Sequence, residues 1–254
     1  MIEVRSLFKS FEGREVLHDI NAQFIEGQTN LIIGQSGSGK TVLMKCLVGL
    51  FEPSKGQILY DGRDFVCMNK NERTALRREM GMIFQSAALF DSMSVLENVM
   101  FPLDMFSTMT LNERKQRARQ CLDRVNLGDA ESKYPGELSG GMQKRVAIAR
   151  AIALNPKYLF CDEPNSGLDP KTSLVIDALI HDITVEYNMT TIMNTHDMNS
   201  VMGIGDSIIF IKEGHREWVG DKTQVANSDN KSLIDFIFAS DLLQKARTAF
   251  IDVD

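Results

Sequence analysis

The chain has 254 residues, of which 43% are hydrophobic and 24% are charged, and its formal net charge is −6. This length and composition are typical of one folded α/β domain, and the acidic balance disfavours a protein that binds nucleic acid. No stretch approaches the roughly 20 apolar residues that a membrane span requires, so we expect any membrane role to come through a partner. The four cysteines are too widely spaced for a zinc or redox pair.

The N-terminal part combines short strands with a glycine-rich loop. Residues 2–25 predict strands separated by turns, and the apolar residues 30–33 predict a buried strand that leads into the sequence GQSGSGKT. This loop matches the phosphate loop, whose backbone N–H groups and following helix bind phosphates. Lys40 would contact the β- and γ-phosphates, and the Thr41 hydroxyl would bind Mg²⁺. The candidate nucleotide-binding residues here are Gly34, Ser36, Gly37, Ser38, Gly39, Lys40 and Thr41.

The middle of the chain is rich in predicted helices. Charged helical segments flank an apolar stretch from Met80 to Met105, and the segment from Ser139 to Pro156 has the apolar spacing of a helix. The next predicted strand, from Lys157, ends in two carboxylates. Asp162 would hold Mg²⁺ through its water shell, and Glu163 would act as the general base on the attacking water. The alternative for these two acids is a helix-capping turn.

The C-terminal part continues the alternation of helices and strands. An amphipathic helix is expected from Thr172 to Tyr187, followed by strands at 190–194 and 207–212 and a helical tail after Gly220. Strands that alternate with helices predict a largely parallel sheet covered by helices.

Several further short motifs occur before and after the strand that ends in Asp162-Glu163. They are Gln85, Leu138-Ser139-Gly140-Gly141, Ser166-Gly167-Leu168-Asp169 and His196. Together with the phosphate loop and the Asp162-Glu163 strand, they resemble the ATP-binding cassette (ABC) ATPases from about Phe11 to Gly220. The resemblance implies an α/β P-loop NTPase fold with a RecA-like core, an N-terminal antiparallel β subdomain and a helical subdomain. It implies one domain over 1–254, with the core at about 1–86 and 157–220, the helical subdomain at about 87–156 and a helical tail at 221–254.

The family resemblance also implies a site that two copies of the chain share, with two ATP molecules bound between them. One copy would contact ATP and Mg²⁺ through Lys40, Thr41, Gln85, Asp162, Glu163 and His196, with Thr41, Gln85 and Asp162 as metal ligands. The other copy would contribute Ser139, Gly140 and Gly141. Phe11 would stack on adenine, although it could instead pack on the edge of a sheet. Asp169 would act across the dimer interface, and the alternative is a helix N-cap.

The segment 84–99 and the form Leu-Ser-Gly-Gly-Met-x-Lys-Arg point to a subgroup. Both resemble the ATPase subunits of bacterial MCE-associated (Mla-type) lipid transporters. Met142 replaces the glutamine of the commonest signature, but the backbone contacts to phosphate do not need that side chain. The resemblance implies phospholipid transport, a permease bound in a groove near Gln85–Phe90, and MCE-type substrate-binding and accessory subunits. The chain would lie at the cytoplasmic side of the bacterial inner membrane.

Two other functions remain open from the sequence. One is the ATPase of a nutrient importer, such as an amino-acid importer, whose partner would include a periplasmic binding protein. The other is an ABC protein without a transport role, such as a division regulator, since that class also has one short cassette.

Overall fold

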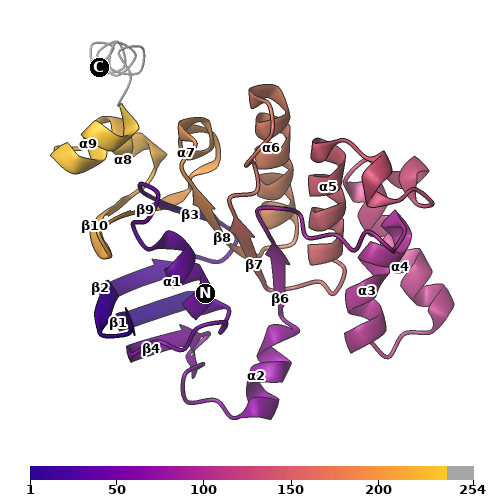
Figure 1. Cartoon of the computed structure of the whole chain (residues 1–254), viewed down its shortest axis with the longest axis horizontal. Coiled ribbons are helices and arrows are strands. Elements are labelled where there is room, and N and C mark those ends of the chain that lie inside the picture. Colours follow the sequence, from indigo (N-terminus) through magenta and orange to yellow (C-terminus); the bar gives the residue numbers. More distant parts are fainter. Residues whose placement is uncertain (239–254) are drawn as a thin grey trace. The chain divides into compact units, whose positions relative to one another are not determined.

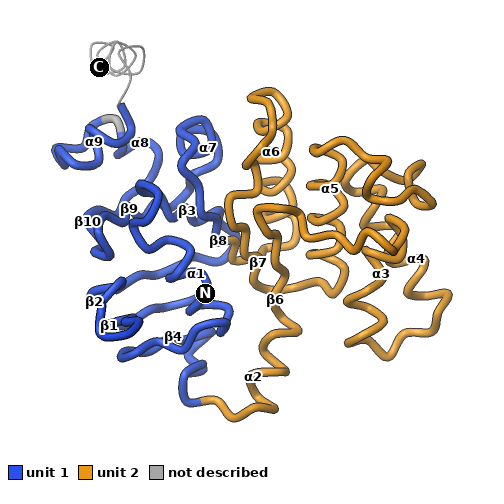
Figure 2. The backbone as a smooth tube through the Cα atoms, in the orientation of Figure 1, with its two compact units in different colours: residues 1–67, 192–254 blue, residues 68–191 orange. Residues whose placement is uncertain are grey.

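The computed structural model describes residues 1–238 of the chain (Figure 1), so part of the expected C-terminal tail, 239–254, lies outside the described residues. The chain divides into two compact units, which Figure 2 colours separately. Of the described residues, the first unit consists of 1–67 and 192–238, and the second of 68–191. The division into a core and a helical subdomain inferred from the sequence stays a prediction.

The first unit contains an antiparallel sheet of four strands in the order β2-β1-β4-β5. This sheet confirms the antiparallel β subdomain that the family resemblance implies. Ile2, Val4 and Leu7 of β1 are buried, and the inward-facing side shifts by one residue between Val4 and Leu7, where the pairing with β2 is irregular. The strands of this sheet are β1 (Ile2–Phe11), β2 (Arg14–Phe24), β4 (Lys55–Tyr60) and β5 (Arg63–Asp64).

A second set of strands in this unit is mixed, with β9 parallel to β3 and antiparallel to β10. The strand order is β10-β9-β3-β8. All five residues of β3 are buried, as expected of a parallel strand covered on both faces. The remaining elements of this unit are β3 (Thr29–Ile33), α1 (Lys40–Leu47), β8 (Thr190–Thr195, from residue 192), α7 (Met198–Ile204), β9 (Ser207–Lys212), β10 (His215–Gly220), α8 (Lys222–Ala226) and α9 (Lys231–Ile237).

The second unit is mainly helical, and its strands β6 and β7 pair in parallel. Helices α3, α4 and α5 pack against one another through buried side chains such as Val99, Leu122 and Val146. Its elements are α2 (Lys70–Arg77), β6 (Met80–Ile83), α3 (Val95–Phe106), α4 (Leu111–Arg124), the 3-10 turns at Gly128–Ala130 and Pro135–Glu137, α5 (Gly140–Ala151), β7 (Tyr158–Asp162) and α6 (Pro170–Glu186). None of the helices within residues 1–238 combines the length and the apolar composition needed to span a bilayer.

One helix ends earlier than its sequence pattern indicates. Helix α5 ends at Ala151, although the apolar spacing predicts a helix up to Pro156. The following carbonyl groups, of Ile152 and Ala153, accept hydrogen bonds from the Arg117 guanidinium at 2.9 and 3.0 Å. The residue before a proline also avoids the helical conformation. A long-range side chain therefore takes over the carbonyl groups that another helical turn would have used.

Candidate nucleotide-binding site

The phosphate loop lies between β3 and α1 and depends on glycine at two positions. Gly34 and Gly39 have φ of 149° and 108°. A Cβ atom on Gly34 would lie 2.2 Å from the carbonyl oxygen of Ile211, and one on Gly39 would lie 2.8 Å from Leu17 Cδ2. No side chain fits at Gly34, because the obstacle is backbone. The loop therefore passes close to β9 and β2 before it enters α1, and this path requires glycine.

Lys40 is the first residue of α1, and its ammonium group lies inside the loop. Nζ donates to the carbonyl oxygens of Gly34 at 2.8 Å and Gln35 at 3.0 Å, and only 5% of the residue is exposed. A buried ammonium group needs such partners. The positive end of the helix dipole lies at the same place, next to the half-buried Thr41. This arrangement places a cation, a helix N-terminus and a hydroxyl group together, which suits a polyphosphate.

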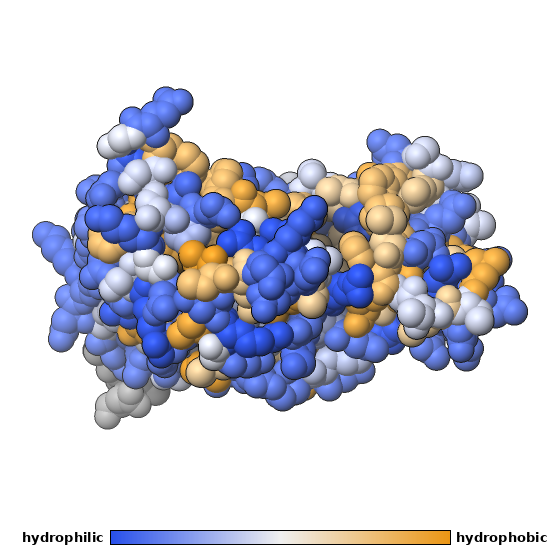
Figure 3. Space-filling model, turned by 90° about the horizontal axis from the view of Figure 1, so that it is seen from below, coloured by the Kyte–Doolittle hydropathy of each residue, from blue (hydrophilic) through white to orange (hydrophobic). Residues whose placement is uncertain are grey.

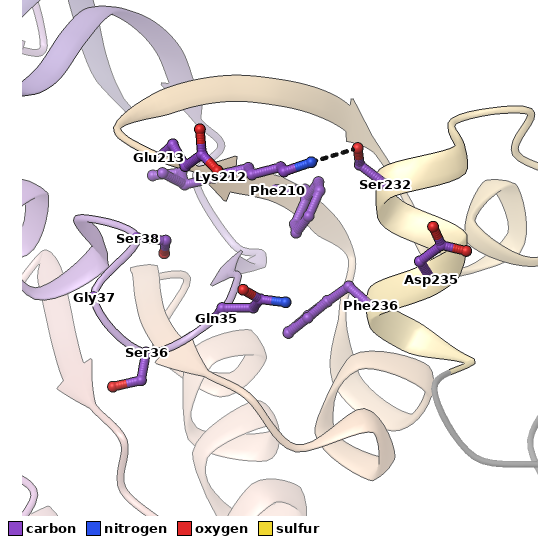
Figure 4. Close-up of a pocket in the computed structure, with 11 residues that line it drawn as sticks. Gln35, Ser36, Gly37, Ser38, Phe210, Lys212, Glu213, Ser232, Asp235 and Phe236 are labelled. Carbon is purple, nitrogen blue, oxygen red and sulfur yellow. Dashed lines mark hydrogen bonds between the residues drawn. The ribbon is translucent and has the colours of Figure 1, made fainter.

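A cavity of about 310 Å³ lies beside the loop, and Figure 4 shows the side chains around it. Its opposite wall comes from β9 and α9, where the rings of Phe210 and Phe236 stack with centroids 5.4 Å apart. Lys212 Nζ donates to Ser232 Oγ at 2.9 Å across the same wall. The described part of the tail, up to residue 238, thus includes a helix that packs on its own unit, next to the phosphate loop.

Two other candidates lie in the first unit. Phe11 ends β1 with 37% of the residue exposed, and its ring meets that of Phe51 edge-on at 5.1 Å. Lys9 Nζ lies 4.6 Å from the centre of the Phe11 ring. His196 is exposed directly after β8, the neighbour of β3 in the strand order. Phe11 therefore packs against neighbours and also keeps an accessible surface, so both of its interpretations stand.

The second unit brings Gln85 and the acidic end of β7 together. Asp162 is the last residue of β7, and Glu163 follows it with a left-handed φ of 49°. Gln85 Nε2 donates to Ser166 Oγ at 3.0 Å and lies 3.4 Å from Glu163 Oε2. A left-handed backbone costs a residue other than glycine about 1–2 kcal/mol and is concentrated at functional sites. Asp162 and Glu163 therefore lead into a strained turn, and Ser166 of this turn accepts a hydrogen bond from Gln85.

The motif Leu138-Ser139-Gly140-Gly141, called the signature motif below, leads into α5. Ser139 is the N-cap, and its Oγ accepts from the backbone N–H of Met142 at 3.3 Å. Ser139 and Gly140 are exposed, and a Cβ on Gly141 would lie 2.7 Å from Thr172 Cγ2. The first turn of α5 therefore presents an accessible helix N-terminus, which attracts anions.

Asp169 takes the capping role that the sequence left as an alternative. It is the N-cap of α6, and its carboxylate accepts from the backbone N–H and the Oγ1 of Thr172 at 3.0 and 2.5 Å. These hydrogen bonds, the one from the Thr172 side chain first, lower the pKa of Asp169. The role across a dimer interface stays a prediction.

The candidate metal ligands have the chemistry that Mg²⁺ prefers. Thr41, Gln85 and Asp162 offer a hydroxyl, an amide and a carboxylate oxygen. Within residues 1–238 there is no cluster of three or more histidine, cysteine or acidic side chains suited to a metal. Mg²⁺ at nucleotide sites usually takes only one or two protein groups and completes its shell with phosphates and water. By their chemistry, the Thr41 hydroxyl in the first unit and the Gln85 and Asp162 oxygens in the second therefore each suit Mg²⁺ bound together with a nucleotide.

Two cations that contact the Gln85 segment were missed by sequence reasoning. Lys144 and Arg150 lie on α5, and both donate to backbone carbonyl groups of residues 85–88. The available signal in the sequence was a lysine at helical spacing from the apolar residues Ala147, Ile148 and Ala151. In the structure only 5% of Lys144 is exposed.

Comparison with known proteins places these features in a family context. Residues 17–166 match the family model described as "ABC transporter". The probable ribonucleotide transport ATP-binding protein mkl of Mycobacterium leprae is 36% identical over 236 residues, which cover 93% of this chain and 68% of that protein. The methionine import ATP-binding protein MetN of Corynebacterium jeikeium is 38% identical over 242 residues, covering 94% of this chain and 65% of MetN. The chain spans about two thirds of the length of these relatives.

Solved structures are similar over nearly the whole chain. The dimeric post-hydrolysis structure of the ATP-binding cassette MJ0796 bound to ADP and Pi is 33% identical, with a TM-score of 0.79, and covers 87% of this chain and 99% of that one. The structure of cbiO1 from Clostridium perfringens, part of the transporter complex cbiONQ, is 29% identical, with a TM-score of 0.84, and covers 98% of each chain. These similarities confirm the expected fold.

Proposed function

The chain belongs to the ABC transporter family, and on that premise we propose that it is the ATP-hydrolysing subunit of a bacterial transporter that moves phospholipid across the envelope. The ATPase class follows from the family and from the similarity to a cassette with bound ADP and Pi. The cargo, the subunit partners and the position at the cytoplasmic side of the inner membrane are the proposed part.

The family resemblance supports the following assignment of residues to the steps of the reaction. Lys40 and the N-terminus of α1 bind the phosphates, and Thr41, Gln85 and Asp162 hold Mg²⁺. Mg²⁺, when bound, offsets the negative charge on the phosphate oxygens. Glu163 orients the attacking water and accepts its proton. His196 contacts the γ-phosphate and Phe11 stacks on adenine, as the resemblance implies.

The exposed start of α5 supports a shared site. Ser139, Gly140 and Gly141 form an accessible helix N-terminus, which suits the γ-phosphate of an ATP molecule bound to a second copy. The similar cassette MJ0796 was solved as a dimer. Both observations support the proposal of a homodimer that closes on two ATP molecules and loosens after hydrolysis.

The phospholipid cargo rests on one observation, the resemblance of residues 84–99 to Mla-type ATPases. The same segment carries exposed apolar side chains, among them Phe84 and Phe90. More follow on and around α3, namely Met105, Phe106, Met109 and Leu111. Figure 3 shows apolar side chains on the side of this unit where Figure 1 labels α3 and α4. Exposed apolar surface of this kind marks a protein interface, and we assign it to the permease.

The similarity to MetN favours one second candidate. MetN is a methionine import protein by name, so the ATPase of an amino-acid importer is the alternative function. The two candidates differ in the membrane protein that binds near Gln85–Phe90 and in what accompanies it outside the membrane.

Co-purification tests the proposal. The tagged full-length chain is isolated from gently solubilised membranes of its own cell, and stoichiometric partners are identified by mass spectrometry. A multi-span permease with an MCE-domain protein is the expected result, and lipid extraction should then recover bound phospholipid. A permease with a solute-binding protein would support the importer instead, and no membrane partner would refute a transport function.

A matched pair of variants locates the permease contact. Phe90→Glu places a charge in the proposed groove, whereas Val185→Glu places the same charge on an exposed apolar position of α6, which is 58% exposed. We expect Phe90→Glu to lose the permease and Val185→Glu to retain it, with ATP binding intact in both. Retention of the permease by Phe90→Glu would contradict the assigned groove.

A further inference from the structure

The segment that follows β6 is irregular and has a strained backbone. Ala87 and Ala88 have φ of 62° and 49°, the left-handed region that side chains disfavour. Such strain persists only where the surroundings fix it. On its C-terminal side, the buried Asn98 bonds to the backbone N–H and carbonyl of Phe90 at 2.8 and 3.1 Å. On its N-terminal side, the constraint comes from two cations.

Both cations belong to α5, the helix that begins with the signature motif. Lys144 Nζ donates to the carbonyl oxygen of Gln85. The Arg150 guanidinium donates to Ala87 and Ala88 with one nitrogen each, at 2.7 Å in both cases. The planar guanidinium fork matches the two adjacent carbonyl groups that the left-handed turn directs toward it.

The two cationic side chains are withdrawn from solvent, since Lys144 is buried and Arg150 is half-buried. Burial lowers the pKa of both Lys144 and Arg150. Hydrogen bonds from a charged donor are stronger than neutral ones, and low local polarity strengthens them further. Breaking the hydrogen bonds between these cations and their carbonyl partners would therefore cost free energy.

Gln85 is thus held through both its backbone and its side chain. Its backbone carbonyl is held by Lys144, while its side-chain amide donates to Ser166 Oγ and lies within 3.4 Å of Glu163 Oε2. A continuous path of contacts runs from Ser139 at the start of α5, through Lys144, to Gln85 and Glu163. A shift of α5 along its axis would move the Gln85 backbone with it.

We infer that Lys144 and Arg150 are positioning residues, which lock Gln85 to α5 so that contact at the Ser139 end sets the position of Gln85 beside Glu163. This inference rests on the proposed roles of Gln85 and Glu163 in ATP hydrolysis. Neither cation is a catalytic residue, because both act through the Gln85 segment.

Steady-state ATPase kinetics of the purified full complex tests this inference. Lys144→Met removes the charge and keeps the length of the side chain, and Lys133→Met makes the same change at an exposed lysine of the same unit. We expect Lys144→Met to lower kcat about tenfold or more with KM for ATP nearly unchanged, because a misplaced active-site group costs turnover rather than binding. Lys144→Arg, which keeps a charged donor, should retain most of the turnover, and Lys133→Met should match the parent.

A double-mutant cycle separates positioning from a general structural effect. If Lys144 acts through Gln85, Lys144→Met should lower kcat no further in a Gln85→Ala background. Thermal unfolding verifies that each variant is folded, and Lys144→Gln replaces Lys144→Met in the cycle if the latter is not. Additive losses, or an unchanged kcat of the folded Lys144 variant, would overturn the inference while the function of Gln85 stands. An unchanged kcat of Gln85→Ala would refute the proposed site itself, and with it this inference.

Discussion

Lys40, which we propose to bind the nucleotide, also takes part in the fold of the phosphate loop. Its ammonium group is buried against two loop carbonyl groups, and the loop can take this path only because Gly34 has no side chain. The spacing of glycine and lysine in this loop is a local pattern, so the sequence alone indicated the phosphate loop, although not the hydrogen bonds from Lys40 to its carbonyl groups. The contacts of Lys144 and Arg150 join residues about sixty positions apart, and no local pattern predicts which carbonyl group a distant cation will meet.

Replacement of Lys40 tests the phosphate loop. Lys40→Ala should weaken ATP binding by about tenfold or more, because a hydrogen bond from a charged group contributes about 1.5–3 kcal/mol. Isothermal titration with a slowly hydrolysed ATP analogue measures the affinity. Lys45→Ala, on the same helix, is the control and should bind as the parent does. Equal affinity in Lys40→Ala and the parent would remove Lys40 from the site.

Among the secondary-structure elements, α3 and α4 begin in ways that the sequence could indicate. Each starts with a capping box, formed by Ser94 with Glu97 and by Thr110 with Glu113. Helix ends that depend on distant residues are different, since the end of α5 is set by Arg117 on α4. The sequence pattern therefore predicted α5 but placed its end at Pro156 instead of Ala151.

The start of α3 also depends on one buried amide. Asn98 is fully buried, donates to the carbonyl groups of Phe90, Met93 and Ser94, and accepts from Phe90 N–H. Asn98→Ala should lower the free energy of unfolding by about 2–3 kcal/mol, because it leaves buried backbone groups unpaired. Urea denaturation measures this, with the exposed Asn112→Ala on α4 as the control. A loss below about 0.5 kcal/mol, the usual range for surface substitutions, would contradict this role.

The two capping boxes predict a loss of stability in acid. The backbone N–H groups of Ser94 and Thr110 donate to the carboxylates of Glu97 and Glu113. These hydrogen bonds lower the pKa of both glutamates below their ordinary value of 4.5. The stability they contribute is therefore fully present above pH 4.5 and is lost as the pH falls through the lower pKa of the folded state. Comparing the parent with the Glu97→Gln/Glu113→Gln variant by urea denaturation from pH 7 to pH 3 measures it. The stability difference should shrink in acid, and a constant difference would disprove the linkage.

At the scale of the whole molecule, the proposal is that two copies of the chain together complete each nucleotide site. In this proposal the phosphate loop of one copy binds the nucleotide, and the exposed start of α5 of the other copy offers a second helix N-terminus to it. The order of the motifs allowed the family and the fold to be predicted from the sequence, because each motif has its place in a chain of βα units. The sequence and this fold do not contain the permease or the cargo, so these were reached only through the resemblance of residues 84–99.

The most direct test of the account is the ATP-dependent mass of the Glu163→Gln variant. Without the Glu163 carboxylate, the attacking water loses its base, so ATP should bind and remain. Light scattering should then show a species near twice the 28.5 kDa of one chain when ATP and Mg²⁺ are present, and a monomer when they are absent. Adding Ser139→Arg should abolish the dimer while ATP still binds. A Glu163→Gln protein that binds ATP yet stays monomeric, or that hydrolyses ATP at the parent's rate, would contradict the account.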